Sequence, residues 1–264
     1  MDSRDYKFYR ESGFDTRQFL EHYVSDSPGM VFVEDFLKFP IENLRKTFRE
    51  GKSRGHIKGD ILIDLSNGSL VHQLYAACDF FTHIIVLKFR DRCIMELKRW
   101  VDSRTGAFHW GHATQLHADD GEECDKLLEK EEKMRFALQH VVKCDLEKEN
   151  MMDPIVLPPA DCIICAWLLD TISKDQDDYM RNLKKFSSLL KPGGHIIIFG
   201  CLESTYFTVG KDKLHLLNYD EDFARKALVG EGFVIDSCEV LKRTVASDLV
   251  DHKGILFIAA HKEK

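Results

Sequence analysis

The stretch Gly59-Asp60-Ile61-Leu62-Ile63-Asp64-Leu65-Ser66-Asn67-Gly68-Ser69 joins a short apolar run to a turn of small residues. Residues 61–65 are short, apolar and rich in β-branched side chains, which predicts a strand. Residues 72–78 after the turn are predicted to form a helix. Small residues in such a turn let backbone N–H groups come close to a bound nucleoside at a helix N-terminus. The stretch therefore predicts the first strand of a nucleotide-binding α/β sheet, although Gly68 is the only glycine in its turn.

Alternation of strand-like and helix-like segments continues along the chain. Helical patterns are expected around Ile94, Leu97 and Trp100 and at 125–142, 175–190 and 220–231. They separate apolar runs that predict strands at 83–89, 141–146, 160–170, 195–200, 233–240 and 254–260. This spacing predicts an α/β fold with a doubly wound, mostly parallel sheet and helices on both faces. The last two strands follow one another without a helix between them, so we expect an antiparallel edge.

The N-terminal part is predicted to be helical and to cap the sheet. One amphipathic helix is expected at 14–24, with Asp15 or Thr16 as its N-cap. A second is expected at 31–48, where Pro40 kinks or divides it. We therefore expect one domain over residues 1–264, with a helical cap or lid at 1–50 and the sheet core at 57–264.

Composition narrows the class of partner. The 264 residues are 44% hydrophobic, which is ample for a core, and carry a net charge of -7. Negative charge argues against nonspecific binding to nucleic acid or an anionic membrane. Neither a signal-peptide pattern nor an apolar run of about 20 residues is present. We expect a cytoplasmic monomer whose partner is a small molecule.

Cysteine and histidine spacing does not predict a metal site. Eight cysteines are spread along the chain, and the one CxxC pair, Cys162 and Cys165, lies in a predicted buried strand. Reduced core thiols are the simpler interpretation. His109, His112 and His117 match no metal-ligand spacing and are expected in a solvated connection at 101–123. No metal is therefore expected.

Six segments, in order along the chain, together carry a resemblance to a known family: 59–64, 73–78, 96–100, 143–145, 157–162 and 188–194. The chain resembles the nicotinamide, indolethylamine and phenylethanolamine N-methyltransferases, and is most similar to the nicotinamide branch. The resemblance implies a Rossmann-like class I methyltransferase fold, S-adenosylmethionine (SAM) as cofactor and a small amine or pyridine-type acceptor.

The resemblance also implies which residues form the site. It places Asp170, Ser204 and Tyr206 on the substrate side. It implies little acid–base chemistry from the protein and leaves the catalytic residues unassigned, because the sulfonium of SAM carries a reactive methyl group and catalysis rests on aligning and desolvating the reactants. Simpler roles stay open, since the three aspartates of the set could cap loops or helices and Tyr23 could belong to the core. The implied cofactor-binding residues are Tyr23, Asp64, Ser66, Asn67, Gly68, His72, Asp145 and Leu146.

Four positions depart from the family pattern. Ser66 replaces a glycine, where its side chain would crowd the methionine end of SAM, and His72 replaces a tyrosine. Gly200 replaces an acid that faces the acceptor. Lys88 replaces an aspartate that accepts hydrogen bonds from both ribose hydroxyls, whereas an ammonium group can only donate. Losing two charge-assisted bonds costs about 3–6 kcal/mol, or roughly a hundredfold to ten-thousandfold in affinity.

Two functions therefore stay open. One is a SAM-dependent methyltransferase with a weakened cofactor site. The other is a non-catalytic relative that keeps the fold for binding or protein interaction. In a variant of the second, Lys88, Arg90 and Arg92 accept an anionic ligand where the ribose would lie.

Overall fold

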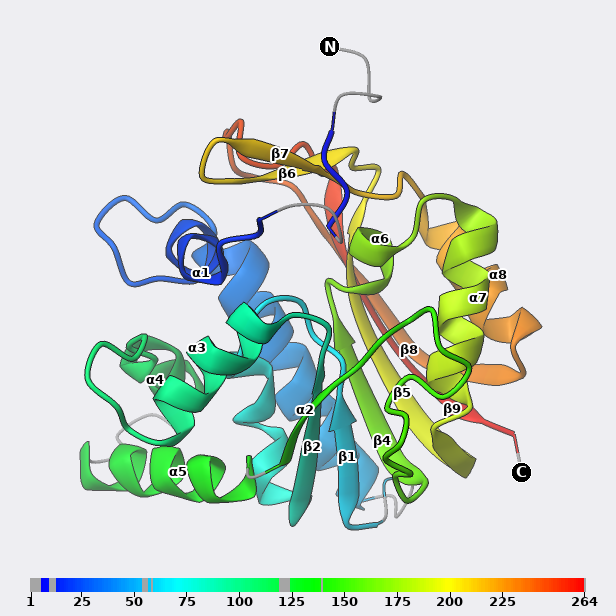
Figure 1. Ribbon diagram of the computed structural model, residues 1–264, viewed down its shortest axis with the longest axis horizontal. Helices are drawn as coiled ribbons and strands as arrows, with labels where there is room; N and C mark the ends of the chain where they lie inside the picture. The colour runs from blue at the N-terminus through cyan, green and yellow to red at the C-terminus, as the bar shows by residue number, and fades with distance from the viewer. Residues whose placement is uncertain are drawn as a thin grey trace.

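A seven-stranded sheet forms the centre of the protein (Figure 1). The computed structural model describes residues 6–9, 13–53, 57, 59–118, 124–138 and 140–263. Strand order is β3-β2-β1-β4-β5-β9-β8; the first five pair in parallel, and β9 is antiparallel to both neighbours. The predicted doubly wound sheet with an antiparallel edge is confirmed. The strands are β1 Ile61–Asp64, β2 His83–Lys88, β3 His140–Lys143, β4 Ala160–Ala166, β5 Leu190–Leu202, β8 Phe233–Lys242 and β9 Gly254–Lys262.

The order of the strands reverses between β1 and β4. β1 pairs with β2 on one side and with β4 on the other, so Ile63 lies opposite both Ile85 and Ile163. Chain connections leave these neighbouring strands in opposite directions, which opens a crevice at their carboxyl ends. Ligands of open α/β sheets bind at such a point.

Helices flank the sheet, with α3, α4 and α5 together on one side of Figure 1 and α7 and α8 together on the other. α3 contacts β2 and β3, α7 contacts β5, α8 contacts β8 and α2 contacts β9. The helices are α1 Thr16–Tyr23, the π-helix η2 Val33–Lys38, α2 Phe39–Ser53, α3 Asp91–Val101, α4 Gly111–His117, α5 Cys124–Ala137, α6 Leu169–Ile172, α7 Gln176–Ser187 and α8 Glu221–Gly230.

Local sequence explains where the main helices begin. The side chain of Asp15 accepts a hydrogen bond from the Gln18 amide and caps α1. Of the two predicted N-cap residues, Asp15 and Thr16, the structure therefore confirms Asp15. Asp175 and Asp220 cap α7 and α8 in the same way. Pro40 is the second residue of α2, directly after the π-helix, so the predicted division of this segment is confirmed.

Three local predictions were wrong or incomplete. The helix predicted at 72–78 is replaced by two short 3-10 turns, η3 His72–Leu74 and η4 Ala77–Asp79, and the residues from 72 to 78 are all buried. The connection expected at 101–123 contains α4, which buries Ala113, Thr114 and His117, while 119–123 lie outside the described residues. An unpredicted hairpin, β6 Tyr206–Val209 and β7 Asp212–His215, follows β5.

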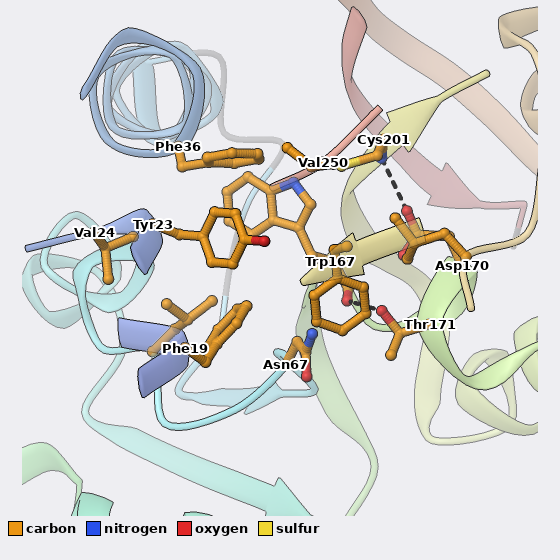
Figure 2. Close-up of a pocket in the computed structure, with 13 residues that line it drawn as sticks. Phe19, Tyr23, Val24, Phe36, Asn67, Trp167, Asp170, Thr171, Cys201 and Val250 are labelled. Atoms are coloured by element: carbon orange, nitrogen blue, oxygen red, sulfur yellow. Dashed lines mark hydrogen bonds between the residues drawn. The ribbon is translucent and has the colours of Figure 1, made fainter. Parts of the chain in front are cut away.

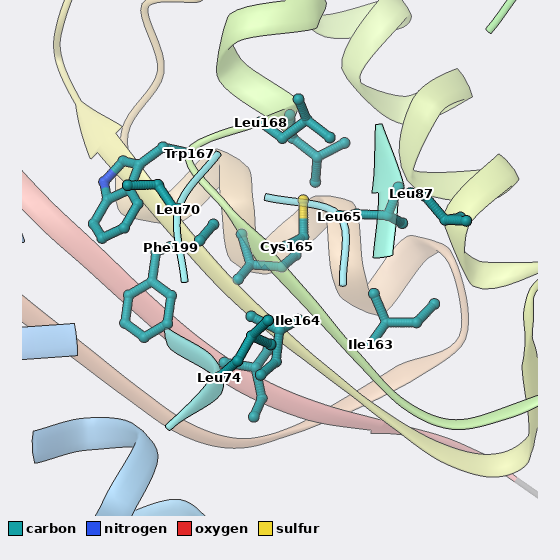
Figure 3. Packing of buried hydrophobic residues seen from close by; sticks show 14 of the residues in the cluster. Leu65, Leu70, Leu74, Leu87, Ile163, Ile164, Cys165, Trp167, Leu168 and Phe199 are labelled. Carbon is teal, nitrogen blue, oxygen red and sulfur yellow. The ribbon is translucent and has the colours of Figure 1, made fainter. Parts of the chain in front are cut away.

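One hydrophobic core extends over both faces of the central strands (Figure 3). All seven residues of β4 are buried, as predicted for a strand that crosses the middle of the sheet. Cys162 and Cys165 are buried thiols within it, and burial raises the pKa of both. Within the described part of the chain, no helix is long and apolar enough to cross a bilayer.

Candidate functional site

Two hollows lie at the carboxyl ends of the parallel strands. An outer cleft of about 500 Å³ is found after β2 and β3, and an inner cavity of about 40 Å³ lies against α1. α6 separates them, because Asp170 and Thr171 face the inner cavity and Ile172 faces the outer cleft. The outer cleft has the size of an ordinary ligand pocket, whereas the inner cavity is far smaller than the about 300–1,000 Å³ that such pockets usually have.

The turn after β1 is closed by its own side chains. Ser66 donates a hydrogen bond from Oγ to Asp64 Oδ1 at 2.6 Å, and Gln73 donates from Nε2 to the same oxygen at 3.2 Å. The backbone of Ser66 is not in the left-handed region, so the serine adds no strain there. Gly68 does have a positive φ of 60°, and a Cβ at this position would lie 2.8 Å from the ring of Phe19. The turn therefore requires glycine only at Gly68.

Lys88 ends β2 and points into the same turn. Its Nζ donates to the Ser66 carbonyl oxygen at 2.8 Å and lies 3.9 Å from Asp64 Oδ2. The side chains of Lys88 and Asp64 are 2% and 0% exposed. The lysine thus fills the space between the ends of β1 and β2, and neither hollow is lined by it.

Burial dominates the electrostatics of this pair. Desolvation raises the pKa of the Asp64 carboxyl, and the nearby Lys88 ammonium opposes that shift. Desolvation also lowers the pKa of the Lys88 ammonium, and Asp64 opposes it. Both directions mean that the mutual attraction across 3.9 Å does not fully compensate for the loss of water. Asp64 and Lys88 therefore fill the interior of the turn, and both side chains already interact with each other and with Ser66.

Aromatic rings surround the inner cavity. Figure 2 shows Phe19, Tyr23, Phe36 and Trp167 facing one another across it. The Phe36 and Trp167 rings are 5.6 Å apart in an edge-to-face arrangement, and the Tyr23 and Phe36 rings are also 5.6 Å apart. Phe207, from the unpredicted hairpin, completes the wall. Such a cavity favours a flat apolar group.

Trp167 has an unusual backbone. It follows β4 with φ of 52°, a conformation that costs a bulky side chain about 1–2 kcal/mol. Its N–H donates to the Phe199 carbonyl at 2.9 Å, and its own carbonyl accepts from Thr171 Oγ1 at 2.9 Å, which hold the residue in place. The strained backbone directs the indole into the cavity wall. Strain of this kind is typical of functional sites.

Three polar side-chain atoms of cavity-lining residues have no hydrogen-bond partner among the described residues. They are Trp167 Nε1, which is a donor, and two oxygens, Asn67 Oδ1 and Asp170 Oδ1, all on buried side chains. An unsatisfied buried polar atom costs about 1–3 kcal/mol. A bound molecule that supplied both an acceptor and a donor would remove this cost.

Asp170 lies at the opposite end of the cavity, on α6. Its Oδ2 accepts a hydrogen bond from the Cys201 amide at 2.9 Å (Figure 2). Burial raises the pKa of the carboxyl to about 6, and backbone N–H groups oppose the shift. The group is thus poised to change protonation state near neutral pH.

Tyr219 occupies the space that a side chain at Gly200 would need. A Cβ built at Gly200 would lie 1.9 Å from Tyr219 Oη and 3.4 Å from Asp170 Oδ2. The Tyr219 hydroxyl therefore takes up the space that an acidic side chain at position 200 would need.

The outer cleft contains the pair predicted after β3. Leu146 is buried, and Asp145 is exposed and accepts from the Glu147 amide at 3.0 Å. Phe89 and Tyr9 provide aromatic surface in the same cleft. An exposed carboxylate beside apolar surface suits a flat ring with polar edges.

The other predicted residues have different places. Tyr23 lines the cavity with its ring, but its hydroxyl is committed to β6, donating to Thr208 O at 2.7 Å and accepting from Thr208 N at 3.0 Å. His72 lies in the core between Trp110 and Trp167, and burial lowers its pKa to about 3. Ser204 and Tyr206 line neither hollow; Ser204 Oγ donates to Asp251 at 2.7 Å, and Tyr206 Oη donates to Asp248 O at 3.0 Å.

The structure thus brings Tyr23, Asn67 and Asp170 to the inner cavity, and Asp145 with Leu146 to the outer cleft. Sequence reasoning missed Trp167, which lies inside the apolar run at 160–170 and directly follows β4. It also missed Phe36 and Phe207, whose helix and hairpin come from distant parts of the chain. Nothing in the sequence signalled a role for Trp167, because the predicted strand continued to residue 170 and did not place the tryptophan at its end.

The sequence is similar to that of known small-molecule N-methyltransferases. A sequence model described as the NNMT/PNMT/TEMT family matches residues 5–263. The chain is 32% identical to the nicotinamide N-methyltransferase of Homo sapiens, over 95% of this chain and 94% of that protein. It is 31% identical to the indolethylamine N-methyltransferase of Oryctolagus cuniculus over 94% and 92%, and 31% identical to the phenylethanolamine N-methyltransferase of Homo sapiens over 79% and 75%.

Solved structures support the fold. The magnesium protoporphyrin IX methyltransferase of Synechocystis PCC 6803, with bound SAM, matches with a TM-score of 0.56 at 12% identity, over 94% of this chain and 90% of that one. A SAM-dependent methyltransferase from Clostridium acetobutylicum ATCC 824 matches with a TM-score of 0.51 at 13% identity, over 85% and 92%. At these identities the likeness concerns the fold alone.

Proposed function

The chain belongs to the NNMT/PNMT/TEMT family, and on that basis we propose that it methylates a small amine or pyridine-type acceptor with SAM, at a cofactor site of reduced affinity. The observation that carries this proposal is the pair of hollows on either side of α6. A two-substrate transfer needs one place for the donor and one for the acceptor, with a short path between them.

The adenine half of the cofactor fits the outer cleft. Asp145 offers an exposed carboxylate that can accept from an amino group, and Leu146 and Phe89 offer apolar surface to the ring. The cleft volume of about 500 Å³ is within the usual range for a nucleoside-sized ligand. We assign Asp145 and Leu146 to this side.

The ribose half does not fit in the same way. No acid stands at the end of β2, and the Lys88 ammonium is bonded to Ser66 O instead. Asp64 is fully buried behind that contact. Because two charge-assisted bonds to the ribose are missing, the affinity for SAM should fall by roughly a hundredfold to ten-thousandfold.

The acceptor side is the inner cavity. We assign Tyr23, Asn67, Trp167 and Asp170 to it, because their side chains line it together. Bound SAM supplies an electrophilic methyl group, so the protein has to orient the acceptor and exclude water. An aromatic wall with one open donor, Trp167 Nε1, and two open oxygens, on Asn67 and Asp170, does this for a flat heterocycle or arylalkylamine that carries a polar substituent. At about 40 Å³ the cavity must widen, by movement of α1 or η2, before such a molecule enters.

Methyl transfer from isotope-labelled SAM tests the proposal directly. The purified chain is incubated with millimolar SAM and a panel of small amines and pyridines, and products are identified by mass spectrometry. We expect a slow, saturable methylation of at least one flat acceptor, and its loss in Trp167→Ala. Absence of any methylated product, with SAM shown to be bound, would contradict the enzymatic proposal.

A second candidate function is a non-catalytic binding protein of the same fold. The observation that favours it is the closed Asp64–Ser66–Lys88 contact, in which the protein's own side chains take the hydrogen bonds that a ribose would make. Under this alternative, neither SAM nor S-adenosylhomocysteine gives detectable heat of binding even at about 10 mM. Calorimetric titration therefore separates the two candidates before any acceptor is known.

A further inference from the structure

Asp26, His109 and His112 meet at the surface, and none of the three lines either hollow. Each offers one ligand atom, and the three atoms lie within 4.8 Å of one another. His109 Nδ1 is 3.7 Å from Asp26 Oδ2. Asp26 belongs to the loop after α1, whereas the histidines come from the start of α4 and the residues before it. Two distant segments of the chain thus bring metal-ligating side chains together.

His112 is oriented as a metal-binding histidine usually is. Its Nε2 lies 2.6 Å from the Val24 carbonyl oxygen. A carbonyl only accepts, so Nε2 carries the proton, and the lone pair of the neutral ring is on Nδ1. That Nδ1 has no hydrogen-bond partner among the described residues. Metal-ligating histidines typically donate their other N–H to a backbone carbonyl in this way, which fixes the tautomer and the ring orientation.

The position of His109 depends on a glycine. A Cβ at Gly111 would lie 2.7 Å from His109 Cε1, so the absence of a side chain leaves room for the imidazole. The His109 and His112 rings are nearly parallel, at 23°, with centroids 6.4 Å apart. The His109 and Asp26 side chains are 76% and 61% exposed, so both can rotate at little cost.

We propose that Asp26, His109 and His112 bind one divalent transition-metal ion, with Zn²⁺ best suited to two imidazoles and one carboxylate. Zinc bonds to such ligands are about 2.0–2.2 Å, so two ligand atoms of one ion are at most about 4.4 Å apart. The observed limit of 4.8 Å therefore requires only a small rotation of the exposed side chains. Water would complete the coordination.

Metal binding at this place would fasten the loop after α1 to the start of α4. α1 carries Phe19 and Tyr23, which form one wall of the inner cavity. The ion would therefore hold the cap against the rest of the protein. This inference does not depend on whether SAM is bound or turned over.

Calorimetric titration of the reduced, chelator-treated full chain with ZnCl₂ tests the site. We expect one ion per chain with a dissociation constant in the micromolar range. His109→Ala and Asp26→Asn should each weaken binding at least tenfold, and Gly111→Ala should weaken it by displacing the His109 ring. His83→Ala is the matched control, because His83 is an exposed histidine at the start of β2, and its binding should equal that of the wild type.

Thermal unfolding gives a second readout. At about a hundredfold excess over the dissociation constant, Zn²⁺ should raise the wild-type Tm by roughly 5 °C or more, and should not do so in His109→Ala. The two exposed-ligand variants should melt like the wild type without metal, which excludes misfolding as the cause. Absence of zinc binding, or binding that is unchanged in both His109→Ala and Asp26→Asn, would overturn the proposal.

Discussion

Replacing Lys88 by aspartate should tighten SAM binding at the proposed cofactor site. Lys88 Nζ is now held by the Ser66 carbonyl at 2.8 Å, and its chain fills the space beside Asp64. Aspartate is shorter, so it vacates that space, and its carboxylate can accept hydrogen bonds from both ribose hydroxyls.

The expected gain follows from the hydrogen bonds involved. Two charge-assisted bonds at about 1.5–3 kcal/mol each give about 3–6 kcal/mol, which is a hundredfold to ten-thousandfold lower dissociation constant. The same change costs stability in the ligand-free protein, because it removes the cation beside buried Asp64 and adds a second carboxylate. Breaking a buried pair in this way costs about 3–5 kcal/mol.

The assay is calorimetric titration of wild type, Lys88→Asp and Lys88→Met with S-adenosylhomocysteine, after circular dichroism has shown that each variant is folded. Lys88→Met keeps most of the volume and removes the charge, so it should give much less gain than Lys88→Asp. The placement of Lys88 against the ribose is refuted if folded Lys88→Asp binds no tighter than wild type, or if Lys88→Met gains as much.

Three further predictions concern stability. Gly200→Ala should lower the free energy of unfolding by about 1–3 kcal/mol, because its Cβ would meet the Tyr219 hydroxyl. A double-mutant cycle with Tyr219→Phe, measured by urea unfolding, should show a coupling energy of at least about 0.5 kcal/mol. Purely additive effects of the two substitutions would contradict the clash. Since burial raises the pKa of Asp170 to about 6, its protonated form stabilises the fold fully below about pH 4, and this contribution of about 3 kcal/mol is lost as pH rises through 6. Asp170→Asn should lack this pH dependence. If the difference in free energy of unfolding between the wild type and Asp170→Asn stays constant from pH 4 to 7, the raised pKa of Asp170 is contradicted. Burial lowers the pKa of His72 and His117 to about 3. The free energy of unfolding is therefore intact above about pH 6.5 and falls, by up to about 5 kcal/mol for each group, as the pH drops toward 3. In His117→Gln the midpoint of acid unfolding, followed by circular dichroism, should shift to lower pH.

Patterns along the chain were sufficient for the sheet because its central strands are apolar runs that alternate with helical segments. β4 is buried along its whole length, so its sequence alone marks it as central. The segment at 72–78 was misjudged because its residues are buried all round, which makes two 3-10 turns and an α-helix look alike in sequence. α4 was missed because most of its residues are polar or small, so its sequence does not reveal the face that packs through Ala113 and Thr114.

The site was only partly visible for a different reason. Substitutions at Ser66 and Lys88 could be recognised against the family pattern, but their mutual contact depends on side-chain direction across two strands. The tyrosine hydroxyl that fills the space at Gly200 comes from a residue beyond the hairpin, and no local pattern connects them. The left-handed backbone at Trp167 is likewise set by its tertiary contacts and not by its residue type.

The most direct test of the central claim is calorimetric titration of the wild-type protein with SAM. If an intact family site binds at about 1 μM, the loss of two ribose bonds predicts saturable binding with a dissociation constant of roughly 0.1–10 mM. A low-micromolar constant would show that the pocket compensates for Lys88 and would contradict the reduced-affinity account. No heat at about 10 mM SAM would contradict cofactor use altogether.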